Sequence, residues 1–200
     1  MNLSFNQYRA IDLTIMAVLL VISEALIAIA ATKWFPVTAF YMVSPMVAMT
    51  CIVMMRWSGF AVIHAALSGL VYCMTLGASA EQYAIYMAGN CGVLIALLVL
   101  KLAGKKRVAQ SGTLIVIFVA VAYAGAQLGR WIVGLMVGGE LADIIKYLTT
   151  DSISLLFAIV VVLIARKPDG LFEDQKAYLI RLEEERREEQ RLHDHDDFAN

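Results

Sequence analysis

The stretch VISEALIAIAATKWFP, residues 21–36, places one carboxylate, Glu24, inside an apolar run that is long enough for a membrane-spanning helix. Such a helix needs about 20 mainly apolar residues, and a charged side chain within it is costly unless it faces protein or water. The sequence Trp34-Phe35-Pro36 ends the run, because proline cannot continue a helix. Glu24 is therefore expected to face the interior of a helical bundle.

The composition divides the chain into two parts. Of the 200 residues 60% are apolar and the mean hydropathy is +0.73, whereas a soluble domain has about 45–50% apolar residues. Residues 1–166 hold ten Lys/Arg and six Asp/Glu, and residues 167–200 hold six and eleven. We therefore predict a membrane domain over residues 1–167 and an acidic, helical cytoplasmic tail over residues 168–200.

Six apolar segments are candidate membrane spans, and together they predict an all-α integral membrane protein. They lie at residues 10–33, 36–56, 59–77, 83–103, 112–137 and 148–166. With both termini in the cytoplasm, eight basic residues lie on the inner side and two on the outer side, which is the distribution that membrane proteins favour. The inner set is Arg9, Arg56, Lys101, Lys105, Lys106, Arg107, Arg166 and Lys167, and the outer set is Lys33 and Lys146.

Two opposite charges, Glu24 and Arg130, are expected at similar heights in the outer half of the bundle, since the first and fifth spans both run outward. Two interpretations remain open for them. They form a structural salt bridge between two helices, or they are polar groups of an outward-facing ligand cavity, because apolar walls with a few convergent polar groups are typical of small-molecule pockets. The candidate substrate-binding residues are Glu24, Tyr41, Ser44, Tyr86, Asn90, Gln127, Arg130 and Trp131.

Small residues recur at every fourth position in three of the spans, where they allow helices to approach closely. The positions are Ala61, Ala65, Gly69, Cys73 and Gly77, then Ala84, Ala88, Gly92 and Ala96, and finally Gly125 and Gly129. The three cysteines have no metal-ligand spacing and are expected to be buried apolar residues. The chain has no catalytic or nucleotide-binding motif. We therefore expect no enzyme activity, no cofactor, no metal site and no binding of nucleic acid.

This layout resembles the substrate-binding S component of an energy-coupling factor (ECF) transporter. The resemblance covers residues 8–168: six spans, the Trp34-Phe35-Pro36 break after the first, small residues in the third and fourth, and a polar cavity that opens outward. It implies a vitamin or micronutrient importer of the bacterial plasma membrane, which works with a membrane coupling subunit and two cytoplasmic ATPases. Two alternatives are a small secondary transporter that works alone and a membrane scaffold that presents its tail to a soluble partner.

The predicted orientation can be tested by labelling single cysteines, introduced into a background without the native ones, with a reagent that does not cross membranes. Ala80→Cys lies in an outer loop and should react from outside in intact cells, whereas Gly104→Cys lies in an inner loop and should not. Reaction at both positions from outside would contradict the six-span topology.

Overall fold

The computed structural model describes residues 4–34 and 43–197, and these residues form helices and connecting turns without a strand. The α-helices are α1 (Phe5–Trp34), α2 (Met46–Trp57), α3 (Ala61–Leu76), α4 (Ala80–Asn90), α5 (Leu97–Ala103), α6 (Lys105–Gln110), α7 (Gly112–Met136), α8 (Asp143–Thr150), α9 (Ser152–Ala165) and α10 (Gln175–Asp197). Two short 3₁₀ segments, η1 (Ser58–Phe60) and η2 (Cys91–Ala96), connect α2 to α3 and α4 to α5.

Four helical segments among the described residues are long and apolar enough to cross a membrane. They are Phe5–Ala31, Met46–Leu76, Ala80–Ala103 and Gly112–Met136, and the pair α8 and α9, bent by 43° at its break, makes a fifth if it is one span. The structure thus agrees with an all-helical, multi-pass membrane protein. The span expected at residues 36–56 falls partly outside the described residues, since these resume at residue 43.

The segment Met46–Leu76 reverses direction at η1, as its contacts with α1 show. Arg56, at the end of α2, binds Asp12 near the start of α1, whereas Ser44, just before α2, binds Glu24 further along α1. Ser68 of α3 also binds Glu24. Helix α2 therefore runs antiparallel to α1, and α3 returns toward the level from which α2 started.

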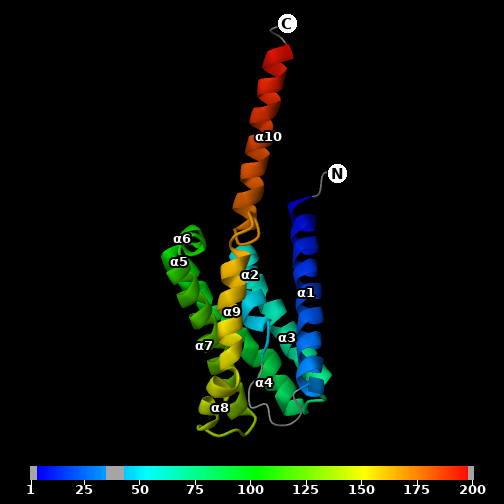
Figure 1. The fold of residues 1–200 in the computed structure, drawn as a ribbon, viewed down its shortest axis with the longest axis vertical. Helices are drawn as coiled ribbons and strands as arrows, with labels where there is room; N and C mark the ends of the chain where they lie inside the picture. Colours follow the sequence, from blue (N-terminus) through cyan, green and yellow to red (C-terminus); the bar gives the residue numbers. More distant parts are fainter. Residues whose placement is uncertain (1–3, 35–42, 198–200) are drawn as a thin grey trace.

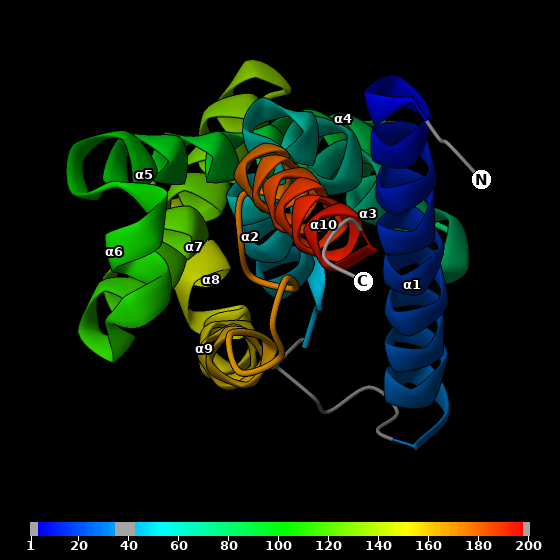
Figure 2. The ribbon, with the colours of Figure 1, turned by 90° about the horizontal axis from the view of Figure 1, so that it is seen from above.

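The helices form an elongated bundle from which the last helix projects. Figure 1 shows that α10 extends away from the end of the bundle at which α1 begins, and that α8 lies at the opposite end. Seen from above, α1 lies along one flank, α5 and α6 lie along the other, and α2 is between them (Figure 2). The tail thus leaves one end of the bundle, and α8 lies at the other end.

The segment between α9 and α10 packs against the end of the bundle. Phe172 is buried with the hydrophobic core, and Arg56 donates to the backbone carbonyls of Gly170 and Leu171 at 2.6 and 3.0 Å. The hydroxyl of Tyr8 donates to the side chain of Gln175, itself buried, at 3.0 Å. The start of the predicted tail is therefore attached to the bundle by both apolar and polar contacts.

Glycines determine the closest helix contacts, as the spacing of small residues predicts. A Cβ atom at Gly92 or Gly129 would collide with the backbone across the interface between α7 and the α4–η2 segment, and so would one at Gly89 or Gly125. A Cβ atom at Gly69 would collide in the same way with the backbone of α4. The prediction is thus confirmed for Gly69, Gly92, Gly125 and Gly129. Gly77 is not such a contact, because a Cβ atom there would meet nothing within 4 Å.

Gly104 allows a turn of the chain and does not pack helices together. Gly104, between α5 and α6, has φ 84°, a left-handed conformation that other residues rarely adopt. A cysteine there would be strained, so Lys106, which is exposed and lies two residues further on in the first turn of α6, is the better labelling position for the inner side.

The glycine contacts predict that one Gly→Ala substitution destabilises the protein and that another has little effect. Gly129→Ala should destabilise the protein by about 1–3 kcal/mol, because overpacking against a backbone forces the helices apart. Gly59→Ala is the control, since a Cβ atom there meets nothing within 4 Å. The thermal unfolding midpoint of the detergent-solubilised protein measures both changes. Equal midpoints for the two variants would show that the α4–α7 contact is not tight.

Candidate functional site

Glu24 is buried in the bundle and is held by two serine hydroxyls. Its side chain is 2% exposed, and its Oε2 accepts hydrogen bonds from Ser44 Oγ at 3.0 Å and from Ser68 Oγ at 2.8 Å. Burying a carboxylate is tolerable only when its oxygens find donors. The two serines provide them, and in doing so they connect α1 to α3 and to the residues that precede α2.

Arg130, in the second half of α7, is the central cation of the site. Its NH1 donates to Asp151 Oδ2 at 2.7 Å and to Gln127 Oε1 at 3.2 Å, and its Nε donates to Asn90 Oδ1 at 2.7 Å. Arg130 and Asp151 are 5% and 4% exposed. Arg130 therefore forms its ion pair with Asp151. This corrects the interpretation of Glu24 and Arg130 as a salt bridge.

A chain of hydrogen bonds connects the two charged centres. The backbone N–H of Ser44 donates to Ser154 Oγ at 2.9 Å, and the Ser154 hydroxyl donates in turn to Asp151 Oδ1. Since Ser44 also binds Glu24, the bonds run without a break from Glu24 to Arg130. Asn90 extends them to α3, because its Nδ2 donates to the carbonyl of Ala65 at 3.2 Å. We call these connected side chains the polar network.

The polar network surrounds a small cavity of about 10 Å³, which is about the room that one water molecule needs. The residues that line it are Glu24, Ser44, Ser68, Tyr72, Tyr86, Asn90, Arg130 and Asp151. The guanidinium carbon of Arg130 lies 5.0 Å from the centre of the Tyr86 ring. The centres of the Tyr72 and Tyr86 rings are 4.8 Å apart. The site is thus closed in this conformation and combines charges, hydroxyls and two aromatic faces.

The structure brings most of the sequence-predicted site residues to this cavity. Those that line it are Glu24, Ser44, Tyr86, Asn90 and Arg130. Gln127 lies just behind, with its Nε2 donating to Asp151 at 2.8 Å. Trp131 lies apart, since its indole N–H donates to the backbone carbonyl of Leu141 at 3.2 Å. Tyr41 lies outside the described residues.

Four members of the site were not among the sequence-predicted residues: Ser68, Tyr72, Asp151 and Ser154. Serine and tyrosine are common enough in membrane helices that their type alone indicates nothing. Asp151 carried a stronger signal, because it is an acid at the edge of the last apolar segment. Asp151 is buried inside the bundle, at the bend between α8 and α9.

No family model matches this chain, and neither a curated protein nor a solved structure matches it. Among the described residues no group of three or more His, Cys, Asp or Glu could hold a metal ion. The residues of the site offer ion pairing, hydrogen bonding and aromatic stacking to a bound molecule.

The pairing of Arg130 with Asp151 predicts which second substitution rescues a defect. Arg130→Gln alone should cost about 3–5 kcal/mol, because it leaves the buried carboxylate of Asp151 without its cation. Adding Asp151→Asn should recover most of this loss, whereas adding Glu24→Gln should recover little. The unfolding midpoints of the purified variants test the pairing, and rescue by Glu24→Gln instead of Asp151→Asn would contradict it.

Proposed function

We propose that this chain is the substrate-binding subunit of a vitamin or micronutrient importer in the bacterial plasma membrane. In this proposal it binds a small molecule on the outer side and depends on a membrane coupling subunit and two cytoplasmic ATPases for transport, as the resemblance to ECF S components implies. The observation that carries the proposal is the polar network, to which α1, α3, α4, α7 and the residues bordering α2 and α9 all contribute around one cavity.

The energetics of burial favour a functional purpose for this network. Replacing a buried ion pair by packed apolar side chains often leaves stability unchanged or increases it, so packing alone gives little reason for Arg130 and Asp151. Ionisable residues inside membrane bundles commonly mark substrate or ion pathways. The aromatic rings of Tyr72 and Tyr86 add the apolar faces that orient a small organic molecule.

Two breaks in the helices supply a route by which the closed cavity could open. Asp151 lies at the 43° bend between α8 and α9, and Ser44 lies just before the start of α2. Movement at a break sacrifices few helical hydrogen bonds, and binding sites of membrane transporters are often built from such discontinuous helices. In this proposal substrate displaces the bonds of Ser44 and Ser154 and enlarges the cavity.

Six crossings with both termini in the cytoplasm are part of the proposal. The reversal at η1 supports them, since α2 and α3 run in opposite directions along α1. Helix α2 has 12 residues, which span about 18 Å at the usual rise per residue. In the proposal this crossing comprises residues 36–56, as the apolar pattern of the sequence predicts, because the hydrocarbon core of a bilayer is about 30 Å thick.

A second candidate function is a scaffold that presents its tail to a soluble partner. The specific observation in its favour is the attachment of α10, whose first residue Gln175 is buried and bonded to Tyr8, while the helix extends beyond the bundle (Figure 1). A stop after Leu182 removes the projecting part and keeps that attachment. A scaffold would lose its partner after this truncation, whereas a substrate-binding subunit would keep its substrate.

The proposal predicts that the tagged chain, purified gently from its native membrane, carries a larger membrane subunit and paired ATPases. Proteoliposomes that contain the chain alone should show no substrate accumulation, because the chain has no motif for ATP hydrolysis. Adding the copurified subunits and ATP inside should restore it. Concentrative uptake by the chain alone, without ATP, would contradict the proposal and favour a secondary transporter.

A further inference from the structure

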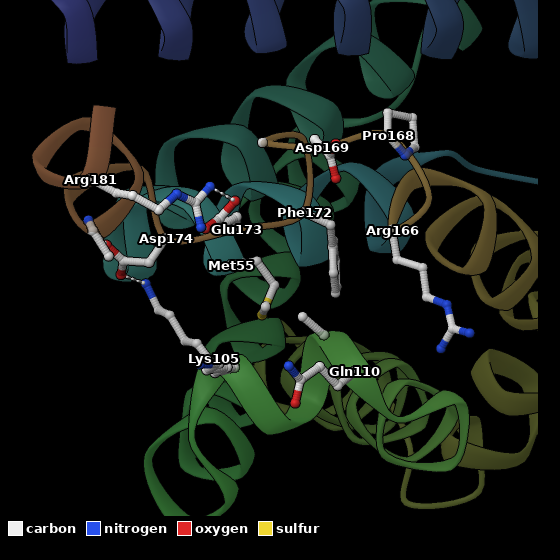
Figure 3. A pocket seen from close by; sticks show the side chains of 14 residues that line it. Met55, Lys105, Gln110, Arg166, Pro168, Asp169, Phe172, Glu173, Asp174 and Arg181 are labelled. Atoms are coloured by element: carbon white, nitrogen blue, oxygen red, sulfur yellow. Dashed lines mark hydrogen bonds and ion pairs between the residues drawn. The ribbon is translucent and has the colours of Figure 1, made fainter. Parts of the chain in front are cut away.

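A second, larger pocket lies at the end of the bundle from which α10 leaves, away from the polar network. Its volume is about 540 Å³, and it lies between α6, the end of α9, residues 168–174 and the first turns of α10 (Figure 3). Met55 and Phe172, both buried, form part of its wall. The pocket is within the size range of small-molecule sites, about 300–1,000 Å³.

Two ion pairs neutralise four of the charged side chains in this pocket. Lys105 Nζ is 2.5 Å from Asp174 Oδ2, and Arg181 NH1 is 3.0 Å from Glu173 Oε1. Partial burial raises the pKa of Asp174, but hydrogen bonds from Lys105 and from backbone amides outweigh it and hold this pKa below its ordinary value. Asp174 is therefore ionised at neutral pH and keeps Lys105 paired.

Two other cations of the pocket are in no ion pair among the described residues. Lys106 and Arg166 line the pocket and are exposed, and Asp169 is the one lining carboxylate that is also outside the ion pairs of the described chain. The lining thus has an excess of one positive charge. The pocket therefore attracts an anion.

Apolar helix faces lead up to the same pocket. On α5, which ends just before Lys106, the side chains of Leu98 and Leu102 are 56% and 86% exposed. On α9, which ends just before Arg166, Ile164 is 58% exposed. Each unpaired cation thus stands at the end of a helix whose exposed apolar residues suit contact with hydrocarbon chains.

We propose that this pocket binds the headgroup of an anionic phospholipid, with its phosphate at Lys106 and Arg166 and its acyl chains along α5 and α9. Basic pockets between membrane helices are suited to such headgroups. A free phosphate ion offers similar anionic oxygens but has nothing to contact the apolar faces. The lipid would brace α6 against the start of α10 and so hold the base of the tail in place.

The test compares lipid binding by two charge-matched double variants of the full chain. Lys106→Gln with Arg166→Gln removes the two proposed contacts, and Lys33→Gln with Lys146→Gln removes two exposed cations elsewhere. Phosphatidylglycerol and phosphatidylcholine are titrated into the detergent-solubilised proteins, and the bound lipid is counted by native mass spectrometry. Thermal unfolding with and without inorganic phosphate is measured in parallel.

We expect phosphatidylglycerol to bind about 30-fold more weakly to the Lys106/Arg166 variant, given the usual contribution of each basic residue near a membrane surface, with little change in the control variant. Both variants should unfold at similar temperatures without lipid, since neither pair of cations is buried. The proposal would be overturned if the wild-type protein bound phosphatidylcholine as tightly as phosphatidylglycerol. It would also be overturned if both variants lost the same affinity for phosphatidylglycerol. Stabilisation by inorganic phosphate that equals that by the lipid would show a free-anion site instead.

Discussion

The pairing of Arg130 with Asp151 is the constraint on which the rest of the bundle depends. A buried guanidinium on α7 is acceptable only if most of its donors are satisfied, and this requires two other segments to lie at fixed positions. The bend between α8 and α9 brings Asp151, and α4 brings Asn90. The close glycine contacts serve this arrangement, because a Cβ atom at Gly89 would meet the backbone of Arg130 itself. Tight packing and the placement of charge are thus two aspects of one interface.

The first helix is held mainly by polar contacts at two levels. Only 22% of its apolar window is buried inside the protein, so much of its surface faces outward. Toward one end Glu24 accepts from Ser44 and Ser68. Toward the other, Arg56 grips Asp12 with two parallel hydrogen bonds, Nε to Oδ2 at 2.9 Å and NH2 to Oδ1 at 2.6 Å. Arg56 also donates to the segment that leads to α10. A shift of α1 would therefore displace Arg56 and with it the start of the tail.

Sequence patterns predict the helices, the close contacts and much of the site, because each depends on residue spacing within one helix. Apolar runs indicate the long helices, and glycines four residues apart indicate the face on which α7 meets its neighbour. The ion-pair partner of Arg130 could not be found in this way, since it depends on the bend that places Asp151. Trp131 was predicted as a site residue but does not line the cavity, and the reason is geometric. Neighbouring residues in a helix point about 100° apart, so a residue next to Arg130 points elsewhere.

In the proposed function, the polar network around Glu24 holds a small molecule. The most direct test of this binding is mass spectrometry of the small molecules released on denaturing the protein, purified in parallel as wild type, Glu24→Gln and the control Trp131→Phe. The account predicts one compound in stoichiometric amount from the wild type and from Trp131→Phe, and its loss from Glu24→Gln. Equal release from all three proteins, or release from none, would contradict it.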